Sequence, residues 1–460
     1  MAAKHGWVLL VLLLAGGLVQ AGPSVESWHT SRGAKVMFVH APELPMVDVR
    51  VVVDGGSARD GGLPGLSRFT NAMLSEGAGE WDAGAMALRL EERGIQLGSG
   101  SLRDMAWISV RSLTDADVLA VALESAQAVL ASPRFDQDAV ERVRQQLQIG
   151  LRHSLQSPGT VAARRFYRTL YADHPYAHDP DGDDASLAKI TVDDLQRFHR
   201  RYYVAENAIV AIVGAVDRKT AESIAEQVTG GLAAGQHAPP LPPVPTVSGG
   251  ELHEAFPSSQ THIYVGQSGM SRHDPDYFAL YVGNHVLGGG SLVSTLGEEV
   301  RNKRGLSYSV YSYFSPMRVD GPFLMVAQTK NDQAEQALKV MRDTLERFVE
   351  DGPSEDELEA AKQNLPEAKS YLSDAWKNLP KGQRYDAIVS NPPIHRGTEE
   401  DMGVLHELVQ GASAHLTVSG VLACVVQKSV GAGALFNDTF KNSRVLLETN
   451  AFQVWCGSKR

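Results

Sequence analysis

The sequence predicts an α+β fold. Two similar α/β-sandwich domains, the second truncated, are followed by a partial α/β segment of another type. The length of 460 residues, with 43% hydrophobic and 7% aromatic residues, fits two to four folded domains. A proline-rich stretch separates two regions whose predicted strands and helices follow the same order. Near residue 366 the charge balance and the cysteine usage change.

The first domain is predicted over residues 26–234. Apolar residues alternate within residues 35–58, which predicts strands, and Gly55-Gly56 ends them before a helix that begins near Leu66. The same periodicities predict further helices over 81–97, 115–130, 136–153 and 192–203, and further strands over 106–110 and 208–214.

Residues 235–250 are predicted to form an extended linker, because their prolines fit neither a helix interior nor a central strand. The second domain is predicted over residues 251–365. Its strand–loop–helix order near residues 258–288 repeats the order near residues 45–75, which indicates an ancient internal duplication.

The N-terminus has the features of a secretory signal peptide. Lys4 and His5 precede an apolar run of 13 residues from Trp7 to Val19, and small residues complete the segment 1–21. A membrane-spanning helix needs roughly 20 apolar residues, so this run is too short to be an anchor. We therefore expect residues 1–21 to be removed on export, leaving a periplasmic protein without a transmembrane span.

Charge and cysteines distinguish the last part of the chain. The net charge of -11 argues against a general nucleic-acid surface. Residues 366–460 hold ten Lys/Arg and nine Asp/Glu, a net charge of +1, which leaves -12 for the rest. Both cysteines, Cys424 and Cys456, also lie there. These differences indicate a junction between unrelated segments.

The segment 65–74 reads GLSRFTNAML. It resembles the active-site helix of the pitrilysin/insulinase family of zinc metallopeptidases, G-x-x-H-F-x-E-H-x-L. In that helix two His bind zinc and the Glu activates water. The three positions hold Arg68, Asn71 and Ala72 here. Arg stays protonated, Asn is not a base and Ala has no donor atom, so none can perform this chemistry.

The third zinc ligand of the family is a Glu about 76 residues further on, which corresponds to Gln148. The resemblance therefore implies a metallopeptidase-like chain that binds no metal and is inactive alone, with zinc held by a partner chain. His174 and His178 are a second candidate pair, but Pro175 between them argues against a helix that presents both, and we predict a hydrated turn.

The segment 299–309, EVRNKRGLSYS, carries Arg301 and Tyr308 seven residues apart. It resembles the substrate-contacting segment of the zinc-free chain in bacterial two-chain family members. The resemblance implies that both residues contact the peptide substrate. The alternative is a helix-end charge and a core strand aromatic. Gly288, Gly289 and Gly290 follow a helix predicted over 277–287, and form either a loop that lines the substrate chamber or a tight turn.

The segment 384–397 reads RYDAIVSNPPIHRG. It resembles the S-N-P-P-F-H-x-G motif of a small-subunit rRNA guanine methyltransferase, in which Asn391 and Pro392-Pro393 correspond to the residues that bind the flipped base. Ile394 replaces the stacking aromatic residue. We expect the second half of a Rossmann-like methyltransferase domain, with a helix over 399–416, a strand over 420–427 and two strands within 445–456.

Residues 366–384 are too few for the strand and loop that bind S-adenosylmethionine, so we predict no methylation. Contact with nucleic acid is expected only through residues 385–397.

Three functions follow from these resemblances. The first is a non-catalytic subunit of a periplasmic heterodimer, in which a zinc-bearing paralogue cleaves the peptide and no cofactor is bound by this chain. The second is a fragment of an S-adenosylmethionine-dependent rRNA guanine methyltransferase fused to a peptidase-like domain. The third is a structural interaction scaffold.

Overall fold

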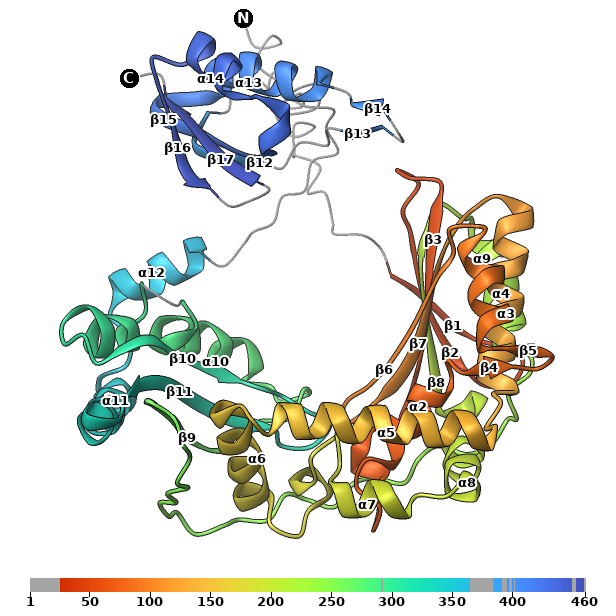
Figure 1. Cartoon of the computed structure of the whole chain (residues 1–460). Coiled ribbons are helices and arrows are strands. Elements are labelled where there is room, and N and C mark those ends of the chain that lie inside the picture. The colour runs from red at the N-terminus through yellow and green to blue at the C-terminus, as the bar shows by residue number, and fades with distance from the viewer. Residues whose placement is uncertain are drawn as a thin grey trace, which may run out of the picture. The chain divides into compact units, whose positions relative to one another are not determined.

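The computed structural model describes residues 25–290, 293–364, 384–390, 395–396, 399–400, 402–448 and 452–458 (Figure 1). The chain separates into two compact units, Met1–Leu365 and Pro366–Arg460. The first unit contains a first lobe (residues 25–232) and a second lobe (residues 260–364). Within the described ranges, no helix is long and apolar enough to cross a membrane.

The first lobe is built on a six-stranded sheet. Its strands are β1 (Glu26–His29), β2 (Lys35–His40), β3 (Met46–Val53), β6 (Gln96–Ser101), β7 (Ala106–Leu113) and β8 (Ala208–Gly214). They lie in the order β1-β2-β8-β3-β7-β6, with β2 and β8 parallel and the other neighbours antiparallel. Every second side chain of β3 is buried, because one face of the sheet packs on helices.

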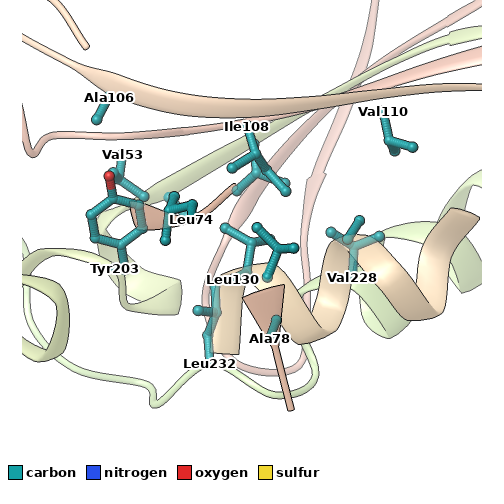
Figure 2. Close-up of a cluster of buried hydrophobic side chains, with 14 of the residues drawn as sticks. Val53, Leu74, Ala78, Ala106, Ile108, Val110, Leu130, Tyr203, Val228 and Leu232 are labelled. Atoms are coloured by element: carbon teal, nitrogen blue, oxygen red, sulfur yellow. The ribbon is translucent and has the colours of Figure 1, made fainter. Parts of the chain in front are cut away.

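Helices cover that face. They are α2 (Leu66–Met73), α3 (Ala83–Glu91), α4 (Ala116–Ala131), α5 (Gln137–Ser154), α7 (Asp184–Lys189), α8 (Val192–Tyr202) and α9 (Arg218–Thr229). A further helix, α6 (Pro158–Tyr171), packs instead against β9 (Gln260–Ser268) of the second lobe. Figure 2 shows Ile108 and Val110 of β7 pointing toward Leu130 of α4 and Val228 of α9. All four are at most 3% exposed. Burying a side chain of this size contributes about 1.5–3 kcal/mol.

The α+β prediction is confirmed, and the predicted elements of this lobe are found with small shifts at their ends. The main difference is the helix predicted over 81–97, because α3 ends at Glu91. The Asp82 side chain caps its first turn by accepting a hydrogen bond from the Ala85 N–H (2.8 Å). Gly94, with φ at +64°, then turns the chain into β6.

The second lobe repeats part of this plan. It contains β9 (Gln260–Ser268), α10 (Tyr277–Asn284), β10 (Ser307–Phe314), β11 (Pro322–Lys330), α11 (Ala334–Asp351) and α12 (Glu355–Asn364). The antiparallel order β10-β11-β9 matches the order β6-β7-β3 of the first lobe. Among the residues described up to 364, no strand corresponds to β8, β2 or β1. The second lobe is therefore an incomplete copy of the first.

A loop of the second lobe, Ser315–Gly321, joins the two lobes. The Asp104 carboxylate of the first lobe accepts hydrogen bonds from the Tyr176 hydroxyl and from the backbone N–H of Arg318 (2.8 Å) in the loop. Tyr176 is fully buried. Since the loop connects β10 to β11, its anchoring fixes the hairpin relative to the first lobe.

Two further contacts strengthen this junction. The Asp54 carboxylate, which is 9% exposed, accepts hydrogen bonds from Nε and Nη2 of Arg59 (2.9 and 2.8 Å) and forms an ion pair with Nη1 of Arg318 (3.0 Å). The buried Tyr171 hydroxyl donates to the Asp320 carbonyl (3.1 Å). The Asp54 carboxylate and the Tyr171 and Tyr176 hydroxyls, all buried at this junction, are thus hydrogen-bonded, which offsets the cost of burying them.

His174 does not lie in a hydrated turn, so that prediction is wrong. The ring is only 4% exposed; its Nδ1 accepts from the Tyr176 N–H (3.1 Å) and its Nε2 lies 3.0 Å from the Pro242 carbonyl of the linker. Burial lowers the pKa of His174 below its usual value. The turn is buried because the linker packs over it through Leu241 and Val244.

The described residues of the C-terminal unit form a four-stranded sheet with two α-helices and a short two-stranded ribbon. It contains β12 (Tyr385–Ser390), α13 (Gly403–His415), β15 (Leu416–Gln427), α14 (Gly433–Thr439), β16 (Asn442–Glu448) and β17 (Phe452–Ser458). The order is β12-β15-β17-β16, with only β12 and β15 parallel. In the described part of this unit β12 has no second neighbour. Such an edge is expected where half of a doubly wound sheet is missing.

The helix predicted over 399–416 begins later, at Gly403, because Glu399–Glu400 pair with His395–Arg396 as two short strands. The cysteines also have defined places. Cys424 lies opposite Trp455, whereas Cys456 lies opposite Ala423. Opposed residues share a face and successive residues alternate, so the two thiols point to opposite faces and remain free.

We expect Asp104→Ala to lower the free energy of unfolding by about 1–3 kcal/mol, because it leaves the buried Tyr176 hydroxyl without its acceptor. The matched control is Asp48→Ala, which removes a half-exposed ion pair with Arg111 (2.7 Å) and should cost about 0–1 kcal/mol. Urea unfolding of both variants measures the difference. Equal losses would contradict the role of the junction.

Candidate functional site

The positions that correspond to zinc ligands hold side chains with other partners. Arg68 on α2 forms an ion pair with Asp181 (3.0 Å). Ala72 packs against the hydrophobic core. Gln148 is half-buried on α5, which packs beside α2. In the part of the chain that the structure describes, no three His, Cys, Asp or Glu side chains are grouped to hold a metal ion.

Asn71, at the position of the catalytic Glu, is part of the core. It is 3% exposed, and its Nδ2 donates to the Trp107 carbonyl (3.1 Å) and the Tyr203 hydroxyl (3.2 Å). Burial raises the pKa of Tyr203. The amide therefore has a structural role where the family places a base.

A buried carboxylate holds the start of α2. Asp60 is 3% exposed and accepts from the N–H groups of Gly65 and Ser67 (both 2.7 Å). Burial raises the pKa of Asp60 well above its usual value, and these hydrogen bonds oppose the rise. Gly65 has φ at +93°, a conformation that favours glycine. The frame of the zinc helix is thus maintained without zinc.

Arg301 and Tyr308 lie together in the second lobe. Arg301 lies in a π-helical turn, η6 (Gly297–Asn302), and Tyr308 lies on β10. The Arg301 Cζ is 4.8 Å from the centre of the Tyr308 ring. The pairing with β11 is irregular between Ser307 and Ser309, which turns the intervening Tyr308 outward. Tyr308 is 83% exposed and is therefore not a core aromatic residue.

The pair borders a pocket of about 690 Å³. Five consecutive residues of β10, Ser309–Tyr313, line one side of it, and Tyr281, Asn284 and His285 line the other. The places of Tyr281, Tyr311 and Tyr313 at this pocket were not predicted from the sequence. The spacing of Tyr311 and Tyr313 puts both on one face of a strand, but which aromatic residues face the pocket depends on the packing of α10 beside β10.

Two of the three glycines do not form the loop or turn that the sequence predicted, whereas Gly290 lies in a turn directly after the helix. Gly288 and Gly289 lie in a second π-helical turn, η4 (His285–Gly289), that continues α10. Only Gly289 lines the pocket, while Gly288 is buried against Ser312, where a Cβ atom would come within 2.3 Å of the Ser312 hydroxyl. η4 can approach β10 this closely at Gly288 because the residue has no side chain.

The two glutamates next to Arg301 in the sequence, Glu298 and Glu299, are bound to other side chains of the same segment. Glu299 is paired with Lys303 (2.8 Å) and Arg304 (2.7 Å), whose hydrogen bonds lower its pKa to about 2. Glu298 accepts from the Asn302 amide (2.8 Å). No carboxylate among the described residues pairs with Arg301. The guanidinium is therefore available to a ligand.

The methyltransferase-like motif, Asn391, Pro392, Pro393 and Ile394, lies outside the described residues. The strand that leads to it, β12, ends at Ser390.

Comparisons with known families match all three parts of the chain. Residues 35–179 match a family described as insulinase (peptidase family M16), and residues 189–365 match the peptidase M16 inactive domain. Residues 353–456 match the methyltransferase small domain.

Solved structures and curated relatives agree. A crystal structure of a peptidase M16 inactive domain from Pseudomonas fluorescens is 41% identical, with a TM-score of 0.74, over 75% of this chain and 84% of that one. A protease from Helicobacter pylori shares the fold at 22% identity and a TM-score of 0.67. An uncharacterized zinc protease of Streptomyces coelicolor is 28% identical over 64% of this chain, which spans 65% of that relative's length. Another uncharacterized zinc protease, from Mycobacterium leprae, is 27% identical over 72% of this chain and 75% of that relative's length.

The degraded zinc helix, the inactive-domain match and the 41% identity to a solved inactive domain together establish that this chain belongs to the M16 (insulinase) peptidase family, with a methyltransferase-like segment at its C-terminal end.

Proposed function

We propose that this chain is the non-catalytic subunit of a zinc-peptidase heterodimer, in which Arg301 and Tyr308 contact the peptide substrate of a zinc-bearing paralogous partner. The observation that carries the proposal is the pairing of a half-buried Arg301 with an exposed Tyr308, without an acidic partner, at the rim of the 690 Å³ pocket. The match to an inactive domain supports it, as do the loss of the zinc ligands at positions 68, 72 and 148 and the loss of the catalytic base at position 71.

The pair suits recognition of a peptide backbone. A guanidinium donates two parallel hydrogen bonds to a carbonyl or carboxylate, and a phenol donates to an oxygen that gains negative charge. The ring of Tyr308 lies against the Arg301 guanidinium and so restrains its orientation before a substrate arrives. Arg68, Asn71 and Ala72 do not fit a zinc ion, so the hydrolytic chemistry belongs to the partner.

The proposal places the complex in the periplasm, on the basis of the charged, apolar and small-residue order of segment 1–21. A structural scaffold is the alternative with the same fold. It predicts that the partner is bound but that Arg301 makes no difference to hydrolysis.

We expect Arg301→Ala to reduce peptide hydrolysis by the reconstituted pair about ten- to a hundredfold, because it removes charge-assisted hydrogen bonds to the substrate. The chain is mixed with a zinc-bearing paralogue, and initial rates are compared with those of wild type. Arg272→Ala is the matched control, since Arg272 also lies over a tyrosine, Tyr277, but outside the pocket. Equal rates for wild type and Arg301→Ala would leave only the scaffold role.

The purified chain is expected to hold no stoichiometric zinc after dialysis against micromolar zinc, because the described residues offer no three-ligand group. Metal content by plasma mass spectrometry checks this expectation, and hydrolysis assays without a partner accompany it. One zinc per chain together with unaided proteolysis would contradict the assignment of a non-catalytic subunit.

A methyltransferase function is the second candidate, favoured by the match over residues 353–456. We expect no binding of S-adenosylmethionine, because residues 366–384 are too few to supply its loop and, in the described part of the unit, β12 has no strand on its outer edge. Isothermal titration calorimetry of the full chain tests this. A measurable heat of saturable binding would revive the candidate.

A further inference from the structure

The pocket beside Arg301 has an unbalanced set of charges. Arg301 and His285 line it, and no Asp or Glu does. The nearest acids in sequence, Glu298 and Glu299, are bonded to Asn302, Lys303 and Arg304 on the same segment. A pocket that offers a cation and no carboxylate is complementary to an anionic group.

A comparison within the same lobe shows that Arg301 is unlike an arginine with a purely structural role. Arg272 lies over Tyr277 at 5.4 Å, and its guanidinium also donates to the Tyr277 hydroxyl (3.0 Å). Arg301 lies over Tyr308 at 4.8 Å without a hydrogen bond of its guanidinium to any described residue. Its five N–H donors are therefore left to solvent or to a ligand.

The pocket also borders a sheet edge. β10 is the outer strand of its sheet, and the Asn284 side chain donates to the Ser312 carbonyl (3.1 Å) from the side away from β11. The backbone N–H and C=O groups of an antiparallel strand point to alternate sides from one residue to the next. Those of Val310, two residues before Ser312, therefore also point away from β11. An extended peptide can add its backbone to such an edge. Tyr281 and Tyr311, 50% and 40% exposed, flank the position.

We propose that this pocket binds the carboxylate of an extended peptide, with the carboxylate on Arg301 and the adjoining peptide group on the backbone of Val310. Two sources have this chemistry, the C-terminal carboxylate and an acidic side chain. The inference deepens the proposed function by naming the substrate class, and rests on it only for the identification of the ligand as a peptide. The binding itself needs no partner, because every lining residue belongs to the second lobe.

The test is fluorescence anisotropy with the full chain and three labelled hexapeptides of one sequence rich in tyrosine and leucine. The first ends in a free carboxylate, the second in an amide, and the third in an amide with one internal glutamate. We expect the free acid to bind about ten- to a hundredfold more tightly than the plain amide, as paired charge-assisted hydrogen bonds imply. If the third peptide matches the first, the site accepts a carboxylate from either source, which also supports the proposal.

Arg301→Gln should remove the difference between acid and amide, while Arg272→Gln should keep it. Arg301→Lys, which retains the charge but loses the paired donors, should keep part of it. Circular dichroism confirms that each variant is folded. Equal affinities of all three peptides for wild type would overturn the proposal, as would a preference that survives Arg301→Gln.

The outcomes separate this inference from the proposed function. Loss of reconstituted hydrolysis in Arg301→Ala, with no preference for a carboxylate, supports the heterodimer and overturns the carboxylate site. A carboxylate preference that depends on Arg301, without any effect on reconstituted hydrolysis, supports the site and overturns the catalytic contribution.

Discussion

The carboxylate of Asp104 joins the two halves of the peptidase-like unit. It accepts one hydrogen bond from a buried phenol of the first lobe and one from a backbone N–H in the β10–β11 loop. Moving the loop away would break the hydrogen bond from the Arg318 N–H to this carboxylate and the ion pair of Arg318 with the buried Asp54. The hairpin that carries Tyr308 is therefore fixed relative to the first lobe by a contact distant in sequence from the pocket. The position of the Arg301–Tyr308 pair relative to the first lobe depends on this contact.

The degraded zinc helix shows why a peptidase frame persists without its metal. α2 is held by Phe69 and Met73, which are fully buried in the core, and by the Asp60 carboxylate at its start. None of these contacts needs a ligand. Asn71 even adds two hydrogen bonds that the core requires, since both of its acceptors are buried nearby. The fold of this helix is thus retained by contacts that do not depend on the zinc ligands.

The incomplete second lobe has consequences for the pocket. In the first lobe, α2 packs against α5 and α8 and has six buried residues, whereas its counterpart α10 has none. Phe278 and Tyr281 of α10 are 77% and 50% exposed. No counterpart of α8 follows α12 (Glu355–Asn364), the counterpart of α5, in the described part of the first unit. One side of the pocket is therefore formed by a helix that its own lobe does not cover.

The sequence by itself determined the fold class, most element positions, the absence of zinc ligands and the seven-residue spacing of Arg301 and Tyr308, because periodicity, residue chemistry and local spacing are all properties of the linear chain. Only the tertiary structure decided that Tyr308 faces outward, since an irregular strand pairing turns it. It also placed His174 under the linker and Gly288 in a helical turn against Ser312, and it left Arg301 without an acid. These outcomes depend on contacts between segments far apart in sequence, for which the local pattern carries no signal.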